Sequence, residues 1–244
     1  MPLETLILLS VGIFVIAALY SSVGHAGASG YIAVMSLLSL APEIIKPTAL
    51  ALNILVASIA TWQFFKAGHF SWRLFWPFAI LAVPFAFLGG YIHLPTHTFK
   101  VILGLVLLYS AASLLFTAQR DKQVSGPPRF QAMGVGAGIG LLAGLTGTGG
   151  GIFLTPLLLF MAWAEVKRAA AVSALFILVN SVAGLAGYLS NANTLPSLIT
   201  PLFVVAALGG GLGSYLGSRR FKPADIKRFL AVVLLIAGAK LILT

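Results

Sequence analysis

The stretches SSVGHAGASGY at residues 21–31 and AGLTGTGGGI at residues 143–152 interrupt two otherwise apolar parts of this chain. Glycines recur in them with one spacing, 120 positions apart: Gly24, Gly27 and Gly30, then Gly144, Gly147 and Gly150. Hydrocarbon offers no partner to backbone N–H and C=O groups, so a break at membrane depth is tolerated only against protein or water. The two breaks therefore predict two copies of one broken-helix unit, built around a binding site.

The composition places most of the chain in a membrane. Of 244 residues, 59% are hydrophobic and only 8% are charged, so most of the chain cannot lie in water. A stretch such as 101–116 is apolar on all sides, whereas a transmembrane strand alternates apolar with polar residues. We therefore expect an all-α polytopic membrane protein. No Lys or Arg precedes the first apolar run, so we expect that run to be a retained helix and not a cleaved signal.

Apolar segments form two similar halves. The first half has segments near 3–23, 30–41, 47–66, 74–92 and 99–117, and the second near 131–146, 150–162, 169–189, 198–218 and 226–243. The polar stretch between them predicts a first repeat at 1–118, a linker at 119–129 and a second repeat at 130–244. Repeats of this kind are common in secondary transporters, whose substrates bind where the halves meet.

The positions of the basic residues favour inverted repeats. If each break turns the chain back, so that each repeat is a broken-helix hairpin plus three transmembrane helices, 12 of the 15 Lys and Arg residues lie on one face. If the chain instead crosses once through each break, the split is 9 against 6. Basic residues of short loops concentrate on the cytoplasmic side. We therefore expect periplasmic termini and a cytoplasmic linker in the cell inner membrane.

Each break is followed by a short apolar helix. Glycine permits positive φ and close approach of the backbone to a ligand, and a helix that begins at the break directs free N–H groups and a partial positive charge towards it. Two such starts facing one cavity would bind a small anion, with the hydroxyls of Ser29, Thr146 and Thr148 as further donors. The alternative is that the glycines only permit tight helix packing, the role we assign to the glycines spaced by four in 136–144 and 209–217.

Polar residues of the following helices complete the candidate site. Asn53 aligns with Ser173 at the same offset of 120, and Asn180 lies two turns further along. An interhelical hydrogen bond is the alternative role of each. The expected substrate-binding residues are Gly24, His25, Gly27, Ser29, Gly30, Asn53, Thr146, Gly147, Thr148, Gly149, Gly150, Ser173 and Asn180.

Charged and titratable residues narrow the function further. Lys, Arg, Asp and Glu are absent from the middle of every segment, so we expect no buried basic counter-ion. His25 is the one titratable side chain at a break, and proton coupling through it stays open beside a neutral, hydrogen-bonded role. The chain has no cysteine, and its other histidines lie in separate loops, so we expect no metal, no cofactor and no enzyme. The net charge of +10 indicates topology and contact with the lipid bilayer, and no nucleic acid.

The whole pattern resembles the sulfite exporter TauE/SafE family of membrane anion transporters. The resemblance rests on GLTGTGGG at 144–151, the Thr-Pro of the next short helix at 155–156, the basic pair at 167–168 and the small-residue helix containing Ser173. In the first half His25, Ala26 and Ala28 replace a more glycine-rich run. The resemblance implies transport of sulfite, or a sulfonate such as sulfoacetate, across the bacterial inner membrane by alternating access. An anion channel and a flippase of a lipid-linked phosphate stay as alternatives, and a homodimer stays open.

Overall fold

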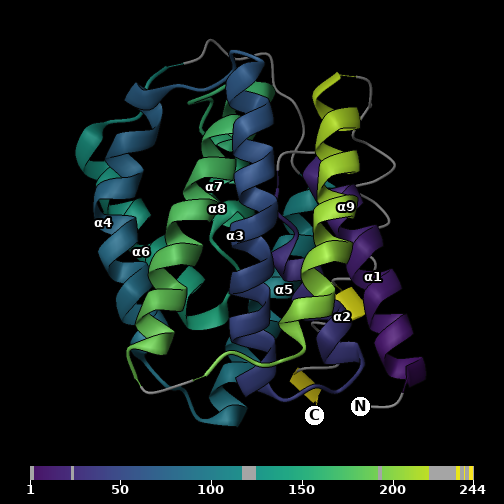
Figure 1. Cartoon of the computed structure of the whole chain (residues 1–244). Coiled ribbons are helices and arrows are strands. Elements are labelled where there is room, and N and C mark those ends of the chain that lie inside the picture. The colour runs from purple at the N-terminus through teal and green to yellow at the C-terminus, as the bar shows by residue number, and fades with distance from the viewer. Residues whose placement is uncertain are drawn as a thin grey trace.

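The fold is all-helical. The computed structural model describes residues 3–22, 25–116, 125–191, 194–219, 235–236, 239 and 242–243. Nine helices form in this part of the chain (Figure 1): α1 Leu3–Ser22, α2 Ala28–Leu37, α3 Pro42–Lys66, α4 Trp72–Tyr91, α5 Thr96–Phe116, α6 Arg129–Thr146, α7 Gly151–Phe160, α8 Val166–Leu189 and α9 Ile199–Arg219.

Six of these helices are long and apolar enough to cross a membrane: α1, α3, α4, α5, α8 and α9. Helices α2 and α7 have ten residues each, about 15 Å of rise, which is half of a hydrocarbon core of about 30 Å. The nine expected segments that fall on described residues are thus confirmed as helices. The tenth, near 226–243, lies almost wholly outside the described residues, as does part of the expected linker.

The chain turns back at the first break. A Cβ at Gly12 of α1 would lie 2.8 Å from Val34 of α2, and one at Gly30 of α2 would lie 2.4 Å from Ile16 of α1. Ascending positions in α1 therefore meet descending positions in α2, and the two helices form an antiparallel hairpin.

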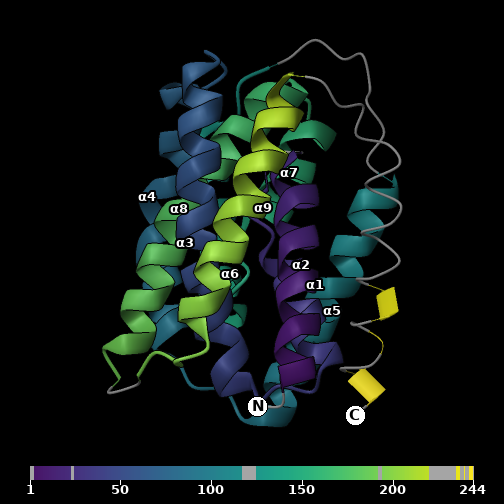
Figure 2. The same cartoon turned by 45° about the vertical axis from the view of Figure 1, so that its right-hand side comes forward.

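Helices of the first half pack lengthwise against helices of the second half. Helix α1 lies along α9, and α6 lies along α4; Figure 2 shows the first of these pairs side by side. Glycines allow the close approach. A Cβ at Gly213 would lie 2.0 Å from the carbonyl oxygen of Ala18, and one at Gly140 would lie 2.2 Å from that of Ala82. The packing role expected for the glycines spaced by four is confirmed at these positions.

Helices α3 and α8 form the centre of the bundle. Two thirds of the apolar window of each is buried, against less than half in the other candidate spans. Figure 1 shows them between the α4/α6 pair and the α1/α9 pair. They run antiparallel, because Asn53 contacts Ser181 while Leu50, one turn earlier, lies beside Gly184. Polar residues on these two helices are therefore held inside the protein.

Candidate functional site

The second break is a run of left-handed glycines. Helix α6 ends at Gly147 with φ +82°, Gly149 has φ +71°, and Gly150 with φ +84° is the N-cap of α7. Residues with a Cβ rarely adopt these angles, so glycine is required here for the chain to leave one helix and begin the next. The first N–H groups of α7 consequently open onto this break.

The first break has one described left-handed glycine. Gly27, with φ +101°, caps the start of α2, while Gly24 lies outside the described residues. Gly30 is not part of the break, contrary to the sequence expectation, because it lies inside α2 and packs on α1. The two capping glycines, Gly27 and Gly150, are 123 residues apart. The short helices α2 and α7 therefore start 123 residues apart, three more than the glycine spacing of 120 in the sequence.

Gly149 touches a polar pair that joins the two halves. A Cβ added there would lie 2.6 Å from Nδ2 of Asn53 and 2.8 Å from Oγ of Ser181. The Asn53 amide donates to the Ser181 hydroxyl at 3.3 Å, and both residues are fully buried. Asn53, one of the residues expected at the site, lies against the second break. Ser181 was missed, because the aligned spacing pointed to Ser173 instead.

The threonine hydroxyls at the second break bond to each other. Thr146 Oγ1 donates its proton to the carbonyl of Leu142 at 2.6 Å. Thr148 Oγ1 lies 3.0 Å from Thr146 Oγ1, and because the Thr146 proton is already used, Thr148 is the donor in the bond between the two threonines. Both protons are thus committed inside the protein. The sequence suggested these two hydroxyls as donors to a ligand, and in the structure each of them donates within the protein instead.

Side chains at the first break form a separate cluster around Tyr20. Ser29 Oγ donates to the Tyr20 hydroxyl at 3.0 Å, and the His25 ring meets the Tyr20 ring edge-on at 6.3 Å. Tyr31 donates to the carbonyl of Ala26 at 2.7 Å, which holds the break against the start of α2. The phenol proton of Tyr20 is not used in the bond with Ser29. Sequence reasoning missed both tyrosines, since an aromatic residue in an apolar run is indistinguishable from core.

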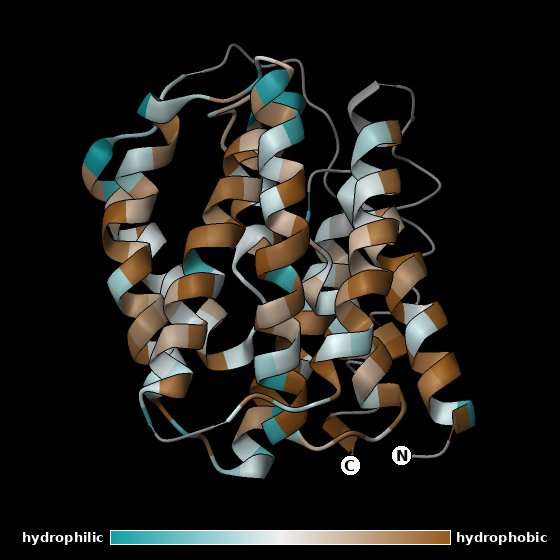
Figure 3. Cartoon of the chain, viewed as in Figure 1, coloured by the Kyte–Doolittle hydropathy of each residue, from teal (hydrophilic) through white to brown (hydrophobic). Residues whose placement is uncertain are grey.

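Ser173 and Asn180 lie on α8 in different surroundings. Thr155 of α7 donates to Ser173 Oγ at 2.7 Å, which ties the short helix to α8. Asn180 is fully buried, and neither atom of its side-chain amide has a hydrogen-bond partner among the described residues; the same is true of Asn53 Oδ1. Leaving such a group buried and unpaired costs about 1–3 kcal/mol, so these amides are candidates for direct ligand contact. Hydrophilic bands at mid-height in α3 and α8 are visible in Figure 3.

Lys46 overturns the expectation that no basic side chain is buried. It is 7% exposed, and its ammonium donates to the carbonyls of Gly89 and Gly90 at 3.1 Å and of Ile92 at 3.4 Å. Gly89 and Gly90 lie in the last turn of α4 and Ile92 is its C-cap, where the helix dipole favours a cation. The sequence placed Lys46 in a loop before 47, but α3 begins at Pro42, a residue that commonly starts a helix.

Both breaks lie against one stretch of α3. A Cβ at Gly147 would lie 3.0 Å from the carbonyl of Lys46, and Gly149 touches Asn53. At the first break, the Ser21 hydroxyl and Val56 both lie within 4 Å of a Cβ placed at Gly210 of α9. Positions 46 to 56 of α3, about 15 Å of helix, therefore run past both breaks. The candidate site is a buried polar region along α3 and α8, with a helix start at each break.

Comparisons with known proteins agree with this architecture. Residues 8–241 match the family model described as sulfite exporter TauE/SafE. A probable membrane transporter protein of Sinorhizobium fredii is 43% identical over 239 residues, covering 96% of this chain and 97% of the relative. Another of Methanocaldococcus jannaschii is 25% identical over 209 residues, covering 80% and 78%. No solved structure matches significantly.

A bundle of six apolar spans with two broken-helix segments and a buried polar region is a multi-pass membrane transporter. The chain belongs to the sulfite exporter TauE/SafE family, as the sequence resemblance predicted.

Proposed function

We propose that this transporter carries small sulfur-containing anions, sulfite or an organosulfonate such as sulfoacetate, across the cell inner membrane by alternating access. The description of the matching family supports the substrate class. The protein offers a polar region enclosed by apolar helices, which suits compact anions and favours the singly charged hydrogensulfite ion over the sulfoacetate dianion, because a second charge makes an ion more costly to dehydrate.

The observation that carries the proposal is the buried side-chain amide of Asn180, whose Nδ2 is a donor without a partner among the described residues, on the helix that crosses α3 at the second break. The breaks start helices α2 and α7, whose free N–H groups and partial positive charge favour an anion over a cation. Asn180 Nδ2 adds a neutral donor. The backbone of Lys46 lies close to Gly147, while its ammonium is held by three carbonyls at the end of α4.

Helix directions support inverted repeats, which alternating access commonly uses. Helix α3 runs antiparallel to its counterpart α8, as an inverted pair should, whereas parallel repeats require these two helices to run the same way. The antiparallel α1/α2 hairpin supports the same model. In the inverted model, 12 basic residues lie on one face of the membrane and 3 on the other. This distribution favours periplasmic termini and a cytoplasmic linker.

Uptake of labelled anions by proteoliposomes tests the function. We expect saturable uptake of radiolabelled sulfite or sulfoacetate, with competition among sulfur oxyanions and none from sodium or a neutral solute. Flux that rises linearly with concentration would instead identify a channel. Transport of a cation or a neutral solute, unaffected by every sulfur oxyanion, would refute the substrate class.

Two substitutions separate the two breaks in the same assay. Ser29→Ala removes the donor to Tyr20 at the first break, and Thr148→Val removes the donor to Thr146 at the second. We expect both to weaken uptake, because each removes a side-chain hydrogen bond at its break. Undiminished uptake in both variants would move the substrate away from the breaks.

A further inference from the structure

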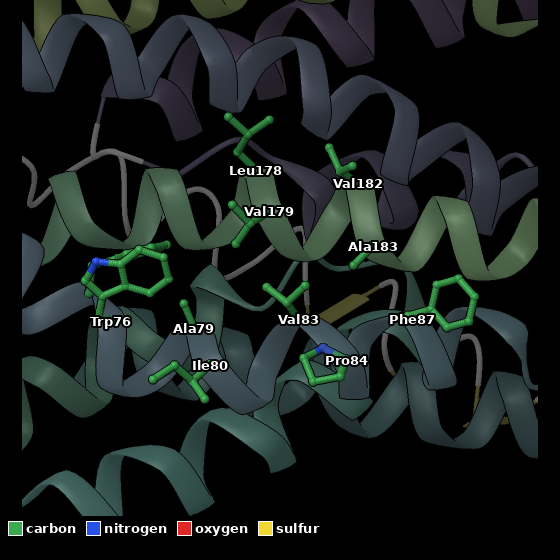
Figure 4. Close-up of a pocket in the computed structure, with 11 residues that line it drawn as sticks. Trp76, Ala79, Ile80, Val83, Pro84, Phe87, Leu178, Val179, Val182 and Ala183 are labelled. Atoms are coloured by element: carbon green, nitrogen blue, oxygen red, sulfur yellow. The ribbon is translucent and has the colours of Figure 1, made fainter.

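An apolar groove lies between α4 and α8, away from both breaks. Its volume is about 700 Å³, within the range of small-molecule sites. Figure 4 shows Trp76 at one end and Phe87 at the other, with side chains of both helices pointing into the space between them. The lining residues are Phe75, Trp76, Ala79, Ile80, Val83, Pro84, Phe87, Leu178, Val179, Val182 and Ala183.

The length of the groove fits one leaflet of a bilayer. From Trp76 to Phe87 is eleven residues of α4, about 16 Å of helix rise. The hydrocarbon core is about 30 Å thick, so one leaflet contributes about 15 Å. A single acyl chain of a membrane lipid therefore matches the groove from end to end.

Basic side chains gather at the Trp76 end. Arg73 precedes Trp76 by three residues, which places both on one face of α4. On α8, Lys167 and Arg168 precede the groove residues Leu178 and Val179 by eleven residues, three full turns, so they share the groove face about 16 Å nearer the helix start.

The two helices run in the same direction along the groove, because Figure 4 shows Trp76 to Phe87 of α4 and Leu178 to Ala183 of α8 both progressing from left to right. Both helix starts, and with them these exposed basic residues, therefore lie at the same end.

A polar pocket lies beside these charges. It has a volume of about 290 Å³ and is lined by Gly68, His69, Glu165, Val166, Lys167 and Arg168, in which Glu165 is the acidic member. Trp72 and Trp76 stack at 6.0 Å and are half exposed at this level. Tryptophan concentrates at the membrane–water interface, so this end of the groove lies at the depth of lipid headgroups.

We propose that the groove binds an anionic glycerophospholipid, with one acyl chain between α4 and α8 and the phosphate headgroup beside Arg73, Lys167 and Arg168. A second copy of the chain fits less well. Around a twofold axis along the membrane normal it would bring a second set of these basic residues to the same end, where like charges repel. A lipid phosphate supplies the opposite charge, and each Lys or Arg near an anionic headgroup contributes about 1 kcal/mol.

Native mass spectrometry of the purified protein, with equal phosphatidylglycerol and phosphatidylcholine of matched chains, tests the proposal. We expect retention of phosphatidylglycerol to exceed that of phosphatidylcholine by about a hundredfold, because each of the three basic residues contributes about 1 kcal/mol. The triple variant Arg73→Gln, Lys167→Gln, Arg168→Gln should lose this preference. Val182→Gln, which places an amide at a half-exposed groove position, should weaken retention of both lipids.

Arg129→Gln, an exposed basic residue at the start of α6, is the matched control and should keep the preference. Thermal unfolding identifies variants that fold normally. Equal retention of the two lipids, or an unchanged preference in a folded triple variant, would overturn the proposal. So would a dimer that Val182→Gln dissociates, because the groove would then belong to a second copy of the chain. The readout is independent of the transported substrate.

Discussion

The side-chain amide of Asn53 donates to the hydroxyl of Ser181 across 3.3 Å, and this bond joins the centre of α3 to the centre of α8. The two residues come from different halves of the chain, 128 positions apart. Gly149 lies against both of them, so the backbone of the second break and the contact between the halves form one unit. A movement of one half against the other has to carry this bond along or break it.

Asn180→Leu should abolish transport while leaving the protein folded. The substitution removes a buried amide without partners and replaces it with an apolar group of similar size, which should leave stability unchanged or raise it by about 1–3 kcal/mol. Proteoliposome uptake and thermal unfolding measure the two effects. Ser214→Ala is the control, because Ser214 is equally buried but bonds to the carbonyl of Gly210 in its own helix. Full uptake by Asn180→Leu would exclude the amide from the substrate site.

Gly149→Ala and Gly68→Ala form a matched pair that separates backbone strain from site geometry. Both glycines have similar positive φ, +71° and +74°, so alanine should cost about 1–2 kcal/mol at either position. A Cβ at Gly68 meets nothing within 4 Å, whereas one at Gly149 pushes on Asn53 and Ser181. We expect Gly68→Ala to transport normally and Gly149→Ala to lose uptake. Equal uptake by the two folded variants would show that the contact with Asn53 is irrelevant to transport.

Lys46→Met should destabilise the protein, because three carbonyls at the end of α4 lose their donor. The expected loss is about 1–3 kcal/mol, measured by chemical or thermal unfolding in detergent. Lys100→Met, at a half-buried lysine of α5, is the control and should change stability less. An unchanged stability of Lys46→Met would mean that the ammonium contributes nothing to holding α3 against α4.

Single-cysteine labelling should place residue 125 in the cytoplasm and residue 97 in the periplasm. The chain has no native cysteine, so Ser125→Cys and His97→Cys each introduce one thiol at an exposed position. An impermeant reagent added to intact cells should modify the second variant and spare the first until the cells are lysed. Modification of Ser125→Cys in intact cells would contradict the inverted topology.

Much of the fold could be predicted from the sequence because apolar runs and glycine breaks are local signals. The expected segment 3–23 is α1 at Leu3–Ser22, and 131–146 is α6 at Arg129–Thr146. The start of α3 was placed five residues late, since a charged residue near a proline resembles a loop when its partners are unseen. The carbonyls that hold Lys46 lie more than 40 positions away, in a helix whose own sequence carries no sign of them.

Residues of the candidate site could be predicted from the sequence only where the backbone conformation alone requires a particular residue type. Gly27, Gly147, Gly149 and Gly150 adopt the left-handed angles that their sequence pattern indicates. Gly30 does not, because a glycine that permits packing and one that permits positive φ look alike in a sequence. Side-chain partnerships such as Asn53 with Ser181 depend on how α3 crosses α8, and no local pattern encodes a crossing point.

The lengthwise packing of α1 on α9 has a consequence for biogenesis. Phe14 and the position of Gly209, which meet in the finished protein, are separated by 195 residues of synthesis. At about 5–20 residues per second, α1 is made roughly 10–40 s before its partner leaves the ribosome. During that interval, lipid and the described helices α2 and α3 are available for α1 to pack against. Neither half completes its own interior among the described helices, because α4 packs on α6 and α8 and α1 packs on α9, so α9 is the last described partner to arrive.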